Sequence, residues 1–157
     1  EILNPQMSFD EDTSLLAAET KLAQNAKKIA LMTLGTAAQK YMMALSEQQE
    51  VLVNCADIIM DAYQMETAIL RAKKYAEKNG EEAAGRYIDM ASVFCNDAIQ
   101  RIDAKAKNTI AAIAEGDEGR TLLVALKRFT KNNSPINTIA ARQRIADTMI
   151  QANTYVY

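Results

Sequence analysis

The segment Val51–Ala76, VLVNCADIIMDAYQMETAILRAKKYA, carries the pattern that decides the fold. Apolar or small residues recur along it in alternating steps of four and three, at Val51, Cys55, Ile58, Ala62, Met65, Ile69, Ala72 and Ala76. This spacing places one apolar stripe on an α-helix that packs side chain into groove against neighbouring helices. Lys78 and Gly80 follow directly, as is typical of a helix end. The segment therefore predicts a long helix, ending near residue 78, within a helical bundle.

Two further long helices are predicted on either side of this segment. The first runs from Asp12 or Thr13, either of which can cap it, to about Leu45. Gly35 interrupts its apolar pattern, and we interpret this glycine as a point of close helix contact. Ser46 and Gln49 form a capping-box pattern at the start of the second helix. A third long helix extends from about residue 81 to the sequence EGDEG at 115–119.

Two shorter helices complete the predicted bundle, at about residues 118–130 and 135–157. Ser134 is placed to cap the last helix, and Pro135 suits its first position. Residues 1–12 are predicted to form an extended lead-in from an upstream body, and residues 13–157 a single helical domain. The fold class is all-α: an antiparallel helical bundle of three long and two shorter helices joined by short loops.

The composition excludes much of the chemistry that helical bundles host, because the 157 residues include no histidine. A phosphotransfer histidine, the usual base of Ser and Cys hydrolases, and the Glu-x-x-His pairs of di-iron bundles are all missing. A zinc site would depend on two cysteines and carboxylates, which is a poor ligand set. We therefore expect no catalytic, cofactor-binding or metal-binding residue in this chain.

Five residues on the predicted long helices could suggest reactive chemistry, and they are Cys55, Cys95, Asp57, Asp61 and Glu66. Cys55 and Cys95 fall on the inward stripes of the second and third helices, so we predict that both are buried core residues. Asp57 and Asp61 lie one turn apart on the second helix, but away from its apolar stripe. We interpret these two carboxylates as solvated surface groups rather than an acid–base pair.

A strip without acids lies near the end of the chain. Between Arg120 and Ala146 there are six cations and no carboxylate, although the net charge of the whole chain is −2. These cations form a candidate interaction face, and they are Arg120, Lys127, Arg128, Lys131, Arg142 and Arg144. The face could meet a carboxylate-rich partner, nucleotide phosphates or an anionic membrane, and the alternative is an ordinary solvated surface. The negative net charge argues against a general nucleic-acid binder.

Two segments resemble a known family. EQQEVLVNCADIIMDAYQMETAILRAKK (47–74) and LLVALKRFTKNNSPINTIAARQRIADTMIQANTYV (122–156) resemble the extra C-terminal helical domain of large bacterial acyl-CoA dehydrogenases. These enzymes are related to the very-long-chain acyl-CoA dehydrogenases. The resemblance covers nearly the whole chain from Asp12, and its most specific part is Lys127–Ala146.

The resemblance implies a parent enzyme that uses FAD to introduce a 2,3 double bond into an acyl-CoA, the first oxidation of fatty-acid β-oxidation. The catalytic glutamate and the flavin-binding segments belong to the main body of that family. Nothing in this chain matches them, so no such residue is carried over and no flavin is expected on this part alone. The implied role is a non-catalytic one in docking, in homodimer architecture or in membrane association.

The expected partners are the main body of the parent, a second subunit in a homodimer and, as a further possibility, an anionic membrane surface. The expected location is cytoplasmic, with peripheral membrane binding as the variant. A chain start without Met favours a piece of a larger protein. The opposing hypothesis is a free-standing helical interaction or sensor module with no enzymatic parent.

Overall fold

A computed structural model of the chain describes residues 14–133 and 135–155. In these residues the fold is all-α, with three long helices of 25 to 33 residues and two shorter ones of 14 and 15. The elements are α1 Ala17–Tyr41, the 3₁₀ helix η1 Met42–Glu47, α2 Gln49–Asn79, α3 Glu81–Ile113, α4 Gly116–Phe129 and α5 Thr138–Ala152. The predicted number and relative lengths of the helices are confirmed.

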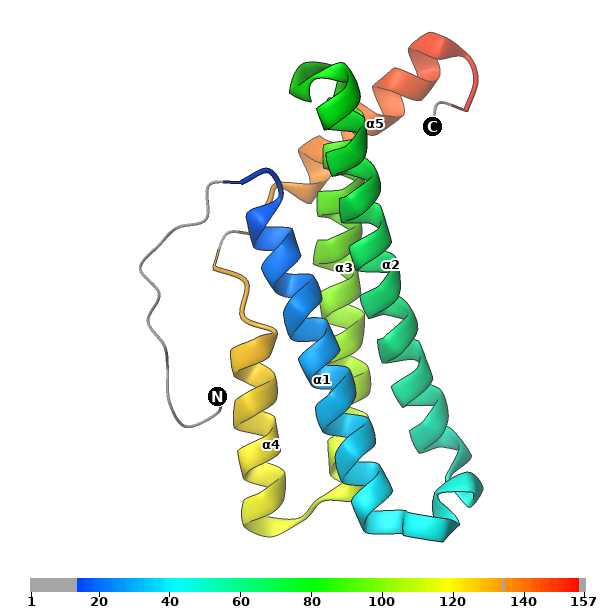
Figure 1. Ribbon diagram of the computed structural model, residues 1–157, viewed down its shortest axis with the longest axis vertical. Helices are drawn as coiled ribbons and strands as arrows, with labels where there is room; N and C mark the ends of the chain where they lie inside the picture. The colour runs from blue at the N-terminus through cyan, green and yellow to red at the C-terminus, as the bar shows by residue number, and fades with distance from the viewer. Residues whose placement is uncertain (1–13, 134, 156–157) are drawn as a thin grey trace.

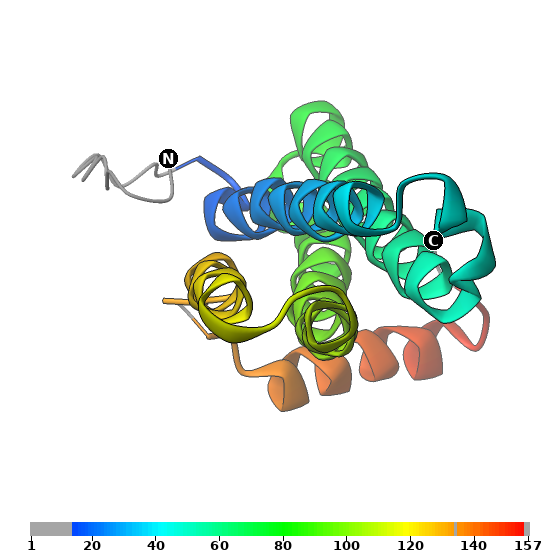
Figure 2. The ribbon, with the colours of Figure 1, turned by 90° about the horizontal axis from the view of Figure 1, so that it is seen from below.

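Helix α3 is the central element of the bundle. The first four α-helices run alternately up and down, and α3 packs against α1, α2, α4 and α5 (Figure 1). Helix α5 runs across the bundle rather than along it (Figure 2). Within the described residues, α4 and α5 both contact α3 and do not contact each other. The two short helices are therefore separate additions to a bundle of three long ones.

The core lies along the predicted stripes. All eight apolar positions predicted for the second helix are buried in α2, and the facing stripe of α3 consists of Ala91, Cys95, Ala98, Ile102 and Ala106. Alanine and cysteine let the helix axes approach closely, while Ile58, Met65 and Ile102 fill the space between them with no exposed surface. Each such large side chain stabilises the fold by roughly 1.5–3 kcal/mol through burial.

The connection between α1 and α2 differs from the prediction. Helix α1 ends at Tyr41 instead of Leu45, because Met42 adopts φ 48° and ψ −119° and the chain continues as η1. Ser46 lies inside η1, and the residue before α2 is Gln48, whose side chain forms no capping hydrogen bond. The predicted capping box is thus wrong. Instead, the backbone N–H of Gln48 donates a hydrogen bond to the Leu45 carbonyl, which closes the 3₁₀ turn before α2.

Two smaller predictions also need correction. Helix α5 begins at Thr138, after Pro135, because the Asn137 side chain accepts from the amide of Ala140 at 3.0 Å and caps the helix there. Gly35 is exposed, and no other described atom would lie within 4 Å of a Cβ at that position, so the expected close contact is absent from the described residues. The lead-in and the proposed caps at Asp12, Thr13 and Ser134 lie outside the described residues.

Candidate functional site

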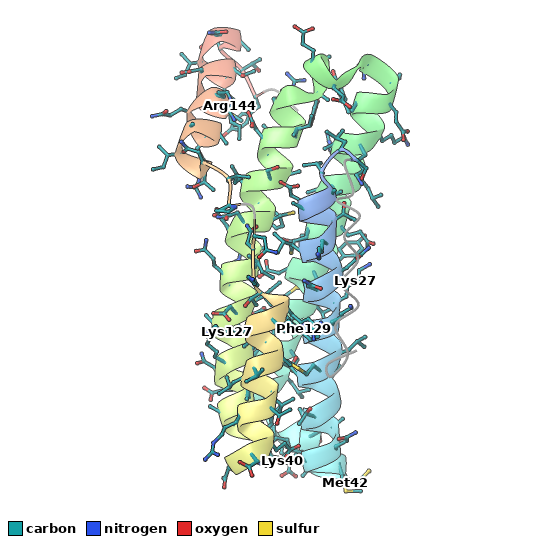
Figure 3. The ribbon with its side chains drawn as sticks, turned by 90° about the vertical axis from the view of Figure 1, so that its left-hand side faces the viewer. Lys27, Lys40, Met42, Lys127, Phe129 and Arg144 are labelled. Carbon is teal, nitrogen blue, oxygen red and sulfur yellow. The ribbon has the colours of Figure 1, made fainter. Side chains whose placement is uncertain are left out.

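The six predicted interface cations fall into two groups. Arg120, Lys127 and Arg128 are on α4 with Lys131 just after it, and Arg142 and Arg144 are on α5. Figure 3 shows Lys127 and Arg144 on these two separate helices. The short connection does not bring the groups together, because α4 and α5 both pack on α3 but do not contact each other in the described residues. The predicted strip is therefore not one continuous surface of six charges.

The two arginines of α5 pair with acids of α3. Arg142 lies 2.6 Å from a carboxylate oxygen of Asp97, and Arg144 donates two hydrogen bonds, of 2.8 and 2.6 Å, to Asp89. Asp89 and Asp97 were not singled out from the sequence. Their spacing of eight residues places them on one helix face, but no sequence signal says that α5 lies across that face. These pairs attach α5 to α3.

The cations of α4 are oriented toward solvent. Arg120 pairs with Asp117 at 2.9 Å, but both side chains are almost fully exposed, so this pair contributes little to stability. Lys127, Arg128 and Lys131 are also exposed, at the end of α4. Among the described residues, Lys127 and Lys131 form no ion pair with the domain. Lys127 and Lys131 are therefore the part of the predicted face that remains available to a partner.

Asp57 and Asp61 are not the solvated pair that the sequence predicted. Asp61 is buried and accepts hydrogen bonds of 2.6 and 3.3 Å from Arg101, while Asp57 pairs with Lys105. Because the two helices are antiparallel, moving four residues forward along α2, from Asp57 to Asp61, corresponds to moving four residues back along α3, from Lys105 to Arg101. Both carboxylates therefore lie in the seam between α2 and α3, a register that one helix pattern does not reveal.

The same seam carries a different cluster nearer the α2–α3 turn. The Tyr75 and Tyr87 rings lie 4.3 Å apart between centroids, and two arginines lie against Tyr87. The Arg86 guanidinium is 4.8 Å from the Tyr87 ring centre and donates to its hydroxyl at 3.0 Å, and the Arg71 guanidinium is 5.7 Å from the ring centre. The buried Nε of Arg86 has no hydrogen-bond partner in the described residues.

A second apolar stripe runs along α2 on the side away from the core. It consists of Val53, Ala56, Ile59, Met60, Tyr63 and Leu70, which we call the outer face of α2, and the exposed Thr67 interrupts its three-and-four spacing between Tyr63 and Leu70. Four of these side chains (Val53, Met60, Tyr63 and Leu70) are 52 to 66 % exposed. Among the described elements α2 packs only on α1, η1 and α3, so none of them covers this face. This second stripe is visible in the sequence, but our prediction included only the buried one.

The two cysteines are core residues, as predicted. Cys55 and Cys95 are free thiols, 2 % and 0 % exposed. Burial raises the pKa of the Cys95 thiol to about 12, with a smaller contribution from the negative charge of Glu19. Burial also raises the pKa of Cys55, partly offset by a hydrogen bond with Thr33. Neither thiol is poised as a nucleophile, since that requires a lowered pKa and access.

No reactive constellation is found in the described part of the chain. No three His, Cys, Asp or Glu side chains there are grouped so that they could hold a metal ion. None of the helices within residues 14–133 and 135–155 is both long and apolar enough to cross a bilayer. The features that remain are surfaces: the outer face of α2, the arginine–tyrosine cluster and the exposed end of α4. The geometry thus defines an all-α bundle with three candidate contact surfaces among its described residues.

Comparison with known proteins identifies the family. The model of the acyl-CoA dehydrogenase, C-terminal domain family matches residues 25–128. A probable acyl-CoA dehydrogenase of Bacillus subtilis (strain 168) is 37% identical over 149 residues, which is 95% of this chain. The crystal structure of an acyl-CoA dehydrogenase complexed with FAD from Bacillus anthracis is 40% identical, with a TM-score of 0.89 over 92% of this chain. The chain belongs to the acyl-CoA dehydrogenase C-terminal domain family.

The relatives are much longer than this chain. The 157 residues span 25% of the B. subtilis protein and 25% of the B. anthracis chain. The resemblance read from the sequence is therefore confirmed at the level of the domain.

Proposed function

We propose that this chain is the non-catalytic C-terminal domain of a larger FAD-dependent acyl-CoA dehydrogenase, and that it docks on the dehydrogenase body through the outer face of α2. The body would supply the FAD site and the catalytic glutamate, and would introduce the 2,3 double bond into the acyl-CoA. The domain would contribute to the architecture of the homodimeric enzyme. Two facts support this assignment: the B. anthracis relative is an enzyme complexed with FAD, and this chain matches only a quarter of the length of both relatives.

The observation that carries the docking proposal is the exposed stripe on α2. Soluble proteins rarely leave a long continuous apolar face uncovered, and such a face marks an interaction site. From Val53 to Leu70 the stripe extends about 26 Å at 1.5 Å per residue, which suits one helix of a partner. A body joined to the domain in one polypeptide is present at a high effective concentration, so it is the occupant that this face fits best.

Two exposed cations at the end of α4 give the proposal a second, separate contact, because α4 does not contact α2 among the described residues. Lys127 and Lys131 would face acidic groups of the body, each with a modest attraction of about 1 kcal/mol or less that salt screens. Arg142 and Arg144 are left out of this contact because Asp97 and Asp89 already bind them. If the chain binds anionic vesicles and loses that binding on Lys127→Glu with Lys131→Glu, these cations serve a membrane instead.

Charged substitutions on the outer face test the proposal. Met60→Lys and Leu70→Lys change exposed positions, so the unfolding free energy of the 157-residue chain should move by no more than about 0.5 kcal/mol. In the full-length enzyme they would bury a charge at the docking contact and loosen the domain. Limited proteolysis between body and domain should then accelerate by about tenfold or more.

Leu31→Lys is the matched control, because Leu31 is also an exposed apolar residue but lies on the solvent side of α1. It should leave the rate of proteolysis unchanged. Equal rates for the two α2 variants and the Leu31 control would refute docking through α2.

A further inference from the structure

The seam between α2 and α3 contains acid–base pairs in one part and, in another part, two arginines with no carboxylate beside them. Asp57 with Lys105 and Asp61 with Arg101 each join an acid of α2 to a base of α3. Three to four turns further along α2, the corresponding place is held by Tyr75 and Tyr87, flanked by Arg71 and Arg86. No carboxylate among the described residues pairs with either of these arginines. The seam thus contains two guanidinium groups at one ring and no acid.

Arg86 is already held in place by the domain. Arg86 stacks on Tyr87 and donates to its hydroxyl, while its buried Nε is left without an acceptor in the described part of the chain. The buried Nε itself is out of reach of a partner, but the remaining N–H donors of a planar guanidinium match a carboxylate. Because packing has fixed the side chain, little conformational entropy remains to be lost on binding. The cluster is therefore arranged to receive an oxygen acceptor from outside the domain.

We propose that Arg71 and Arg86 bind an acidic side chain of the dehydrogenase body when the body docks on the outer face of α2. The proposal rests on the docking function above and names the polar contact that fixes its register. Arg71 is exposed and lies one residue beyond Leu70, at the end of the apolar stripe. A helix lying on the stripe would bring a carboxylate at its end to this cluster. Apolar contact would supply the affinity and the charged contact the position along α2.

The acids already near this end of the domain do not fill the role. Glu82 is one turn before Arg86 on α3, and Glu77 lies six residues after Arg71 on α2, but both are exposed and neither forms an ion pair with these arginines in the described residues. Asp89 is taken up by Arg144. The missing acceptor is therefore assigned to the partner.

Carbodiimide coupling in the full-length enzyme tests this assignment. The reagent joins an amine to a carboxylate that it already contacts, so Arg71→Lys supplies an amine at the site and keeps the charge. Mass spectrometry of the digested product should find position 71 joined to an Asp or Glu of the body, with a yield that falls in high salt. The wild-type enzyme, which has no amine at position 71, is the control. Links from position 71 only to Glu77, Glu81 or Glu82, or no link at all, would overturn the proposal.

A second measurement separates this inference from docking itself. In a full-length Met60→Cys variant, the rate of thiol labelling at position 60 reports whether the outer face of α2 is covered. Adding Arg71→Gln and Arg86→Gln should accelerate labelling by about tenfold or more, as expected when one side of an interface charge pair is removed. Lys21→Gln, an exposed charge of α1, should not change it.

The three outcomes have different meanings. Slow labelling that the arginine changes accelerate supports both proposals. Slow labelling that they leave unchanged leaves docking in place and overturns the role of the arginines. Labelling as fast as in the isolated chain, with both arginines present, overturns docking.

Discussion

The attachment of α5 to α3 gives a prediction whose size follows from the structure. Helix α5 buries only Ala141 completely, so the pairs Arg142–Asp97 and Arg144–Asp89 carry much of its attachment. We consider Asp89→Lys together with Asp97→Lys. Exposed or half-exposed pairs contribute about 0.2–1 kcal/mol each, and reversal replaces attraction by repulsion. Reversal at the half-exposed Arg142–Asp97 pair alone should cost about 1 kcal/mol of local stability, and reversal at Asp89 acts in the same direction.

Hydrogen exchange measures this effect helix by helix. A loss of about 1 kcal/mol or more in local opening corresponds to exchange roughly five times faster or more at the α5 amides. The amides of α2 should change little, because their core contacts stay in place. Restoring attraction with Arg142→Glu and Arg144→Glu in the same chain should return α5 to slow exchange.

The matched control is Asp103→Lys, which reverses another acid of α3. Asp103 pairs with Lys107 on the same helix and not with α5, so this change should leave the α5 amides unaffected. The reasoning is refuted if the control accelerates α5 as much as the double reversal, or if neither change accelerates it.

Three further substitutions test local features of the fold. Burial raises the pKa of Cys95 to about 12, so the folded state keeps a proton that the unfolded thiol loses near its ordinary pKa of 9.0. The unfolding free energy of the wild-type chain should therefore fall between about pH 9 and 12, measured relative to that of the Cys95→Ala variant. Parallel urea-unfolding profiles for the two proteins would contradict this. Gly35→Ala should stabilise the chain by roughly 0.5–1 kcal/mol, since a Cβ there meets no described neighbour; a lower melting temperature would show that the site is strained. Met42→Gly should add roughly 1 kcal/mol by relieving a positive φ at an exposed residue, and thermal melts check that as well.

The periodic pattern of the sequence was sufficient for the fold of the long helices. The stripe from Val51 to Ala76 is buried as predicted, because burial of one face is what this spacing produces in a bundle. The turn after Tyr41 was not predictable in the same way. It depends on one residue, Met42, in a conformation that the sequence does not favour for a side chain.

The surfaces were harder to predict, because they depend on which helices are neighbours. A short connection between α4 and α5 suggested that their cations lie together, but each helix finds its apolar partner on α3. The charge of Arg144 is then used within the domain. Likewise, the pattern of α2 alone predicts that Asp61 lies on the surface, whereas the register of α2 on α3 places it beside Arg101. The outer stripe of α2 is visible in the sequence, but only the structure shows which of the two stripes of this helix is buried against other helices.

The central claim is that the outer face of α2 is covered by the dehydrogenase body. Hydroxyl-radical footprinting measures this directly, because Met60 and Tyr63 are exposed and oxidisable in the isolated chain. In the full-length enzyme both side chains should be strongly protected, while Leu31 on α1 should be oxidised at the same rate in the two samples. Oxidation of Met60 and Tyr63 at equal rates in the full-length enzyme and in the 157-residue chain would contradict the account.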